Sequence, residues 1–96
     1  MSGLEYLKNT DGFRYELWEG SQLVSQVDYL IDGNTVSLTH TGTPAQYRGR
    51  GLAAKIVEFA LDDIRDQGQR VEPLCPYVAS YIADNPEYAD LVATRV

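Results

Sequence analysis

The hydrophobic pattern of this 96-residue chain changes its period once, close to Pro44. Before this proline, apolar and polar residues alternate, which is typical of strands with one buried face. From about Gly51 to Gln67, apolar residues recur every three or four positions, as they do on one face of a helix. The sequence therefore predicts a strand-rich first half followed by a helical second half.

Turn residues divide the first half into four expected strands. Asp11-Gly12, Glu19-Gly20-Ser21 and Asp32-Gly33-Asn34 are the turn signals. The expected strands are residues 4–9, 13–19, 22–32 and 35–41. The residues expected on buried strand faces are Phe13, Tyr15, Leu17, Leu23, Val27, Tyr29, Ile31, Val36, Leu38 and His40, with Arg14 and Glu16 on a wet face. The pattern indicates an antiparallel meander of about four strands.

The second half adds helices and one short strand. The helix over 51–67 ends at Gly68, and residues 70–74 form a strand in which Pro73 cannot donate to a ladder. A second helix follows from Pro76 to Asp84, and Asn85-Pro86-Glu87 opens a final short helix through Val92. A strand, a helix and a strand in one sheet imply a right-handed parallel crossover. We therefore expect an α+β fold of order ββββαβα, as a single domain over residues 1–96.

Composition and charge narrow the classes of function. The chain is 44% hydrophobic, and it shows neither a membrane span of ~20 apolar residues nor a signal peptide, so we expect a cytoplasmic protein without a membrane partner. One cysteine and one histidine build neither an internal disulfide nor a zinc cage, so we expect no metal. The net charge of −6 argues against nucleic-acid binding. The basic residues Arg48, Arg50, Lys55, Arg65 and Arg70 gather in one stretch, which favours a small anionic ligand.

The segment Gln46-Tyr47-Arg48-Gly49-Arg50-Gly51 lies between a strand and an amphipathic helix. Glycines allow tight turns and close approach to a ligand, and the unpaired N–H groups of a helix N-terminus attract phosphate. The segment matches neither a Walker loop nor the Rossmann Gly-x-Gly-x-x-Gly. Taken alone, it fits a phosphate site or an ordinary turn equally well.

Three segments together resemble the small, stand-alone members of the GNAT superfamily of N-acetyltransferases. They are the glycine segment, His40-Thr41 with Pro44 upstream of it, and Pro73-Leu74-Cys75-Pro76 followed by Asn85-Pro86-Glu87-Tyr88. The resemblance implies that the strands ending at Thr41 and beginning near Val71 splay apart to admit the pantetheine arm of acetyl-CoA. The residues it implies for cofactor binding are Thr41, Gly42, Thr43, Gln46, Tyr47, Arg48, Gly49, Arg50, Gly51, Leu52, Cys75 and Tyr81. The chain departs from the family pattern at Gly42, where relatives tend to carry an acid, and at Asn85, where they carry histidine.

Two residues are the candidates for catalysis. Cys75 is expected at a helix N-terminus, where the helix dipole favours thiolate, so it is either a reactive thiol beside the thioester or an inert, packed cysteine. His40 is either a core histidine or the general base that deprotonates an acceptor amine. Tyr77, Tyr81 and Tyr88 are expected as core aromatics, with donation of a proton to the departing CoA thiolate as the alternative.

The leading hypothesis is an N-acetyltransferase-like enzyme that binds acetyl-CoA and transfers acetyl to an unidentified amine. The alternatives are a non-catalytic CoA-binding module, acting as a sensor or accessory protein, and a protein-interaction domain. We expect a monomer or weak dimer. The sequence indicates neither the acceptor nor the physiological role.

Overall fold

One sheet of five strands, in the order β1-β2-β3-β4-β5, organises the computed structural model. The model describes residues 3–93; residues 1–2 and 94–96, at the two ends of the expected 1–96 domain, lie outside it. The elements are β1 (Leu4–Asn9), β2 (Arg14–Glu19), β3 (Gln22–Asp32), β4 (Thr35–Gly42), the 3-10 helix η1 (Ala45–Tyr47), α1 (Leu52–Asp66), β5 (Arg70–Pro73), α2 (Pro76–Asp84) and the 3-10 helix η2 (Pro86–Leu91). Strands β1 to β4 are antiparallel, and β5 pairs parallel to β4. The expected ββββαβα order is confirmed.

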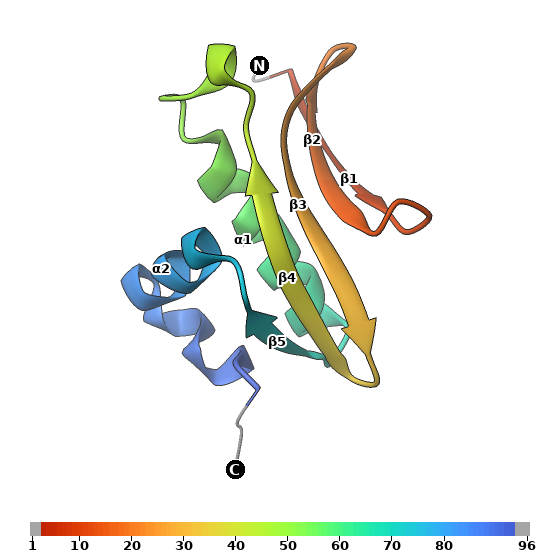
Figure 1. The fold of residues 1–96 in the computed structure, drawn as a ribbon, viewed down its shortest axis with the longest axis vertical. Coiled ribbons are helices and arrows are strands. Elements are labelled where there is room, and N and C mark those ends of the chain that lie inside the picture. Colours follow the sequence, from red (N-terminus) through yellow and green to blue (C-terminus); the bar gives the residue numbers. More distant parts are fainter. Residues whose placement is uncertain (1–2, 94–96) are drawn as a thin grey trace.

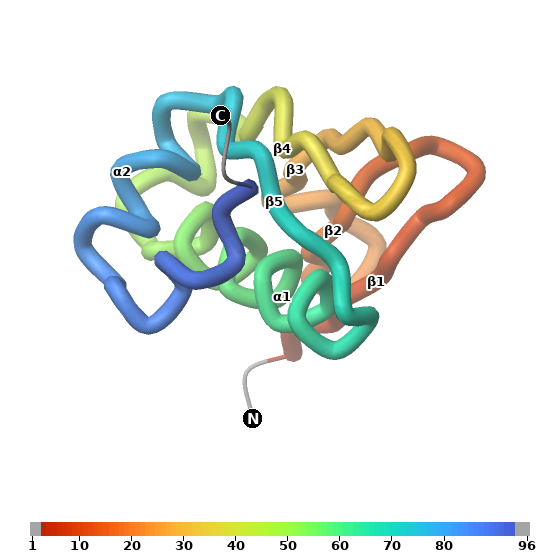
Figure 2. Tube along the Cα trace, turned by 90° about the horizontal axis from the view of Figure 1, so that it is seen from below, coloured from red at the N-terminus to blue at the C-terminus, as the bar shows by residue number. Residues whose placement is uncertain are grey.

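Helix α1 lies against one face of the sheet, and α2 lies beside the β4–β5 edge. Figure 1 shows α1 running behind β3 and β4, and Figure 2 shows α1 in the hollow of the curved sheet with α2 to one side. The apolar stripe of α1, including Ile56, Val57 and Ile64, is fully buried against Leu17, Leu38 and other sheet residues. Within residues 3–93 no helix covers the opposite face, which we call the uncovered face. No helix in this described part is long and apolar enough to cross a membrane.

Two β-bulges change which residues face the core. In β4, Leu38 lies opposite Tyr29 and His40 lies opposite Asp28, so Thr39 is an extra residue. This bulge turns His40 out of the face of Val36 and Leu38, and His40 is exposed. The expectation that His40 shares their buried face is therefore wrong.

The second bulge lies in β3 and has the same kind of effect. Leu23 pairs with Trp18 and Ser25 pairs with Leu17, so Val24 is the extra residue and is fully buried in place of Leu23. Two further residues expected in the core lie at strand ends and are exposed, Phe13 at 51% and Ile31 at 47%. In β3 and at the start of β2, a bulge or a strand end interrupts the alternation of buried and exposed side chains. Whether a residue is buried therefore depends on its position relative to that interruption.

Glu16 was expected on the wet face of β2, but its side chain is only 2% exposed. Its carboxylate accepts hydrogen bonds from Asn9 Nδ2, Arg14 Nε and Trp18 Nε1. Burial raises the pKa of Glu16, but the donors on Asn9, Arg14 and Trp18 lower it further, so the pKa lies below its ordinary value. The charged form is therefore favoured in the folded chain.

We expect Glu16→Gln to lower the free energy of unfolding by about 1–3 kcal/mol at neutral pH, because three donors lose a charged acceptor. The pKa of Glu16 is lower in the folded chain than in the unfolded chain. The stabilisation is thus complete above the ordinary carboxyl pKa and is lost as the pH falls through the folded-state pKa. Urea unfolding of both proteins across acid pH should show the difference shrinking toward zero. A difference independent of pH would contradict the assignment.

The pairing of β4 with β5 is short. It covers Thr35 to Leu38 on β4 and ends at Pro73, after which the Cys75 amide donates to the Leu38 carbonyl at 2.9 Å. Because β4 continues to Gly42, its last residues have no β5 partner on that side. The loss of pairing at Pro73 follows from its missing N–H. The result is a free edge of β4 facing α2.

Candidate functional site

A cleft follows the free edge of β4 and continues to the start of α1. Its larger part is a cavity of about 600 Å³ lined mainly by residues of β3 and the end of β4, including Gln26, His40 and Thr41. Its smaller part, of about 220 Å³, lies against Gly49, Gly51 and the beginning of α1. Both parts are lined by Thr43, Arg48, Ala53 and Tyr77, so they form one continuous cleft.

The glycine segment forms a tight turn that leaves the start of α1 open. Gly49 and Gly51 have φ angles of 87° and 74°, in the left-handed region that side chains disfavour. Gly51 is the N-cap of α1, no side chain caps this end, and the first turn carries no acid. A Cβ at either glycine would meet nothing within 4 Å, so the space beside the turn is empty. An uncapped helix N-terminus facing empty space suits an anionic group.

The two arginines of the turn point to different places. Arg48 Nε donates to the Thr43 carbonyl at 3.1 Å, and Arg48 lines both parts of the cleft. Arg50 instead makes a bidentate ion pair with Glu19 at the end of β2, at 3.0 and 2.7 Å. The hydrogen bonds from Arg50 hold the pKa of Glu19 below its ordinary value. The Arg50 guanidinium is thus already engaged by the sheet.

The expected basic cluster is divided in the fold. Arg65 pairs with Asp90 at 3.0 Å, and Arg70 Nη1 donates to the Asp90 carbonyl. Both therefore lie at the end of α1 remote from Gly51, because the helix separates its two ends. Only Arg48, Arg50 and Lys55 remain near the turn.

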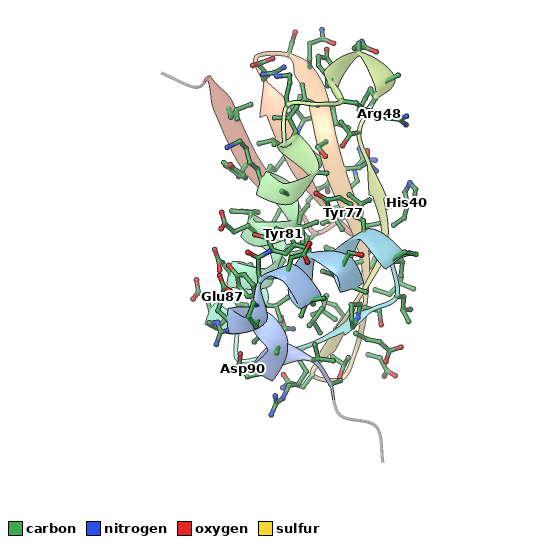
Figure 3. The ribbon with its side chains drawn as sticks, turned by 90° about the vertical axis from the view of Figure 1, so that its left-hand side faces the viewer. His40, Arg48, Tyr77, Tyr81, Glu87 and Asp90 are labelled. Carbon is green, nitrogen blue, oxygen red and sulfur yellow. The ribbon has the colours of Figure 1, made fainter. Side chains whose placement is uncertain are left out.

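His40 lies on the side of β4 away from the helices. In Figure 3 its side chain projects to the same side as that of Arg48, whereas Tyr77 lies toward the helices. A Cβ at Gly42 would sit 3.6 Å from His40 Nε2, so these two residues share the uncovered face. His40 is exposed and lines the larger part of the cleft. Its imidazole is therefore within reach of a molecule approaching from the uncovered face.

Cys75 is the N-cap of α2 and is buried, with 6% exposure. Its Sγ lies 3.4 Å from Thr41 Oγ1. Burial raises the pKa of the thiol, but the Thr41 hydroxyl and the backbone N–H groups of Val78 and Tyr77 lower it further, so the pKa lies below its ordinary value. The thiol lines neither part of the cleft, and it bridges the free edge of β4 to the start of α2.

The tyrosines of the C-terminal helices are also separated. Tyr77 is 41% exposed and lines both parts of the cleft. Tyr81 lines neither part and packs against Tyr88, with ring centroids 6.1 Å apart. The Tyr88 hydroxyl donates to Asp62 at 2.8 Å. Among the residues of α2, Tyr77 in the first turn is the one that lines the cleft.

The other residues expected at the site differ in whether they line the cleft. Gly42, Thr43 and Leu52 line the cleft, whereas Gln46 is exposed and lines neither part. The Tyr47 hydroxyl donates to Gln22 Oε1 at 3.3 Å. The lining residues that the sequence did not indicate as part of a site include Leu23, Ser25, Gln26 and Ala53. Tyr77, which the sequence suggests as a core aromatic or a proton donor, is exposed and lines the cleft.

The chain combines a bulged β4, a β5 that parts from it, and a glycine turn that opens α1. The family described as GCN5-related N-acetyl-transferase matches residues 14–91, which is more than half of the chain. The chain therefore belongs to this family.

Curated relatives match over a shorter stretch. The chain is 35% identical over 56 residues to protein NATD1 of Xenopus tropicalis, which covers 58% of this chain and 51% of that protein. It is 37% identical over 51 residues to human protein NATD1, covering 53% of this chain and 45% of the human protein. The chain thus spans about half the length of these relatives.

Solved structures are similar over most or all of the chain. The NMR structure of a GCN5-like protein from Staphylococcus aureus superposes with a TM-score of 0.74 at 17% identity, covering 100% of this chain and 94% of that one. The crystal structure of the ribosomal-protein-S18-alanine N-acetyltransferase from Escherichia coli gives 0.60 at 14% identity, covering 85% and 51%. At these identities the similarity concerns the fold.

Proposed function

We propose that this chain binds acetyl-CoA in the cleft and transfers the acetyl group to an amine. Family membership supports the class of reaction. The observation that carries the proposal is the continuous cleft, which runs from the uncapped start of α1 to the free edge of β4. Acetyl-CoA is elongated, with a diphosphate in its middle part and a thioester at its end. It therefore requires one surface for the diphosphate and a second surface for the arm that carries the thioester.

Each part of the cleft suits one part of the cofactor. The diphosphate lies against Gly49, Gly51 and the first N–H groups of α1, with Arg48 beside it. The pantetheine arm follows Thr43 and Thr41, where β5 leaves one side of β4 without a strand partner. The thioester then lies near His40, at the far end of the cleft.

The chemistry is direct attack of the amine on the thioester. His40 removes a proton from the amine, the nitrogen forms a bond to the carbonyl carbon, and the carbon–sulfur bond breaks. Tyr77 donates a proton to the departing CoA thiolate, since its phenol lines the cleft and is protonated at neutral pH. Cys75 supports the site through Thr41 and takes no acetyl group, because its buried Sγ lies outside the cleft lining.

Native mass spectrometry with acetyl-CoA, followed by an acetylation assay on simple amines, tests the proposal. We expect a non-covalent 1:1 complex and acetylation of at least one amine. A covalent acetyl adduct on Cys75 would contradict direct transfer. Binding without turnover would favour the non-catalytic CoA-binding module, and no complex would contradict both.

We expect Glu19 to hold the cofactor turn in place through Arg50. Glu19→Gln should weaken acetyl-CoA binding only a few-fold, since exposed ion pairs contribute little. Arg50→Glu should weaken it more, because it places a second negative charge beside Glu19. The exchanged pair Glu19→Arg with Arg50→Glu should recover most of the affinity lost in Arg50→Glu. Calorimetry on the four proteins checks this. An exchanged pair as weak as the single Arg50→Glu variant would mean that Arg50 contacts the phosphate directly.

A further inference from the structure

The uncovered face carries two rows of polar side chains beside the cleft. The strand register places Arg14, Asp28 and His40 in one row across β2, β3 and β4. Glu16, Gln26 and Gly42 form the next row. Residues directly opposite in antiparallel strands point to the same face, so the row of Asp28 ends at His40.

We propose that Asp28 binds the acceptor as an alkylammonium ion on the uncovered face, beside His40. This inference rests on the proposed function and names the chemical class of the acceptor. The ion is an unbranched primary amine in its protonated form. A lysine side chain and a free diamine both present this group.

The two rows contain two carboxylates, Glu16 and Asp28, and only Glu16 forms an ion pair within residues 3–93. Glu16 is buried and already accepts three hydrogen bonds, one of them from Arg14. Asp28 accepts one hydrogen bond from Gln26 Nε2 at 3.0 Å, and within residues 3–93 it forms no ion pair. Although Arg14 lies opposite Asp28, its guanidinium is bound to Glu16. A half-buried carboxylate with one amide donor retains most of its attraction for a cation.

The larger part of the cleft opens on the uncovered face beside His40, where the acceptor must enter. Gln26 and His40 from the uncovered face line the same cavity as Ala53 and Tyr77 from the helical side. Gly42 lies between Gln26 and His40, and a Cβ there would contact both, at 3.7 and 3.6 Å. Since glycine has no side chain, the floor between them stays open. An amine can therefore approach from the uncovered face while the cofactor occupies the helical side.

The neighbouring apolar residues favour a methylene chain behind the ammonium group. Leu23 lines the cavity, and Trp18 lies directly opposite Leu23 on the same face. Both lie along the strands from Gln26 and Asp28 and can cover an unbranched alkyl stem. An acidic or bulky branched acceptor would meet either the carboxylate or this apolar pair unfavourably.

The proton balance is complete. The ammonium group is drawn to Asp28 and gives one proton to His40, which passes it to solvent. The neutral nitrogen attacks the thioester carbonyl carbon and becomes cationic again, and Asp28 stabilises this charge. As the amide forms and the carbon–sulfur bond breaks, Tyr77 protonates the departing thiolate to the thiol. The second proton of the nitrogen passes through solvent to Tyr77 and restores its phenol.

Asp28→Asn tests the inference, with Asp32→Asn at the exposed end of the same strand as the matched control. The probes are Nα-acetyl-lysine amide, cadaverine and aniline, which is neutral at assay pH. We expect Asp28→Asn to raise KM for the two alkylamines about ten-fold or more, as expected for loss of a charged hydrogen-bond partner. KM for aniline and the Kd for acetyl-CoA should stay unchanged in both variants, and circular dichroism checks the fold.

The outcomes separate the two proposals. A lower KM for the lysine amide supports a protein side chain as the source, and a lower KM for cadaverine supports a free polyamine. Unchanged alkylamine KM in Asp28→Asn, or a wild-type chain that binds acetyl-CoA but acetylates neither alkylamine, overturns the inference. Failure of the wild type to bind acetyl-CoA overturns the proposed function instead.

Discussion

Replacing Gly49 with glutamate should abolish acetyl-CoA binding while the chain still unfolds cooperatively. Gly49 lines the smaller part of the cleft with a φ angle of 87°, and the space where its Cβ would lie is empty. The glutamate would place a carboxylate where we propose that the diphosphate lies. Like-charge repulsion and the filled space together should weaken binding by more than about 100-fold, or roughly 3 kcal/mol.

Gly49→Ala is the matched control for this variant. It carries the same backbone strain, of about 1–2 kcal/mol for a left-handed position, but adds no charge and little volume. Its binding should weaken far less than that of Gly49→Glu, and its thermal unfolding should shift in the same way. Calorimetric titration with acetyl-CoA measures both. Equal affinity of Gly49→Glu and the wild type would mean that the diphosphate lies elsewhere.

Replacing His40 with alanine should lower kcat by about 10²–10⁴-fold, the range for loss of a general base. The Kd for acetyl-CoA should stay within a few-fold of wild type, because His40 lies at the far end of the cleft from the glycine turn. The fold should be unaffected, since His40 is exposed and outside the core.

Added imidazole provides the control for a proton-transfer role. Because His40 faces the open side of the cleft, free imidazole can enter the vacated space and should restore part of the activity of His40→Ala. Steady-state kinetics with and without imidazole give the result. Turnover of His40→Ala close to that of the wild type would remove His40 from the mechanism.

The elements of this fold were predictable from local signals. The turn at Asp11-Gly12 ends β1 at Asn9 as expected, and the helical period over 51–67 gives α1 to within a residue at each end. Pro73 marked the point where β5 stops pairing. These features depend on residues close together in the chain, which is why periodicity and turn chemistry suffice for them.

The features that local patterns did not predict depend on how one strand or segment packs against another. The bulge at Thr39 depends on how β4 pairs with β3, and no local pattern reveals that it turns His40 outward. Glu16 is buried because donors from β1 and β2 surround it, which a strict alternation of wet and dry faces does not anticipate. The ion pair of Arg50 with Glu19 joins residues 31 positions apart. The position of Arg50 next to a glycine turn suggests a phosphate contact, and no local pattern indicates that Arg50 also pairs with Glu19.

An NMR titration of the ¹⁵N-labelled chain with acetyl-CoA tests the central claim most directly. We expect saturable shifts that are largest for the amides of the glycine turn, the first turn of α1 and the end of β4, with β1 unaffected. The matched titration of Gly49→Glu should show none of these shifts. A wild-type spectrum unchanged at millimolar acetyl-CoA, or shifts centred on β1, would contradict the proposal that this cleft binds the cofactor.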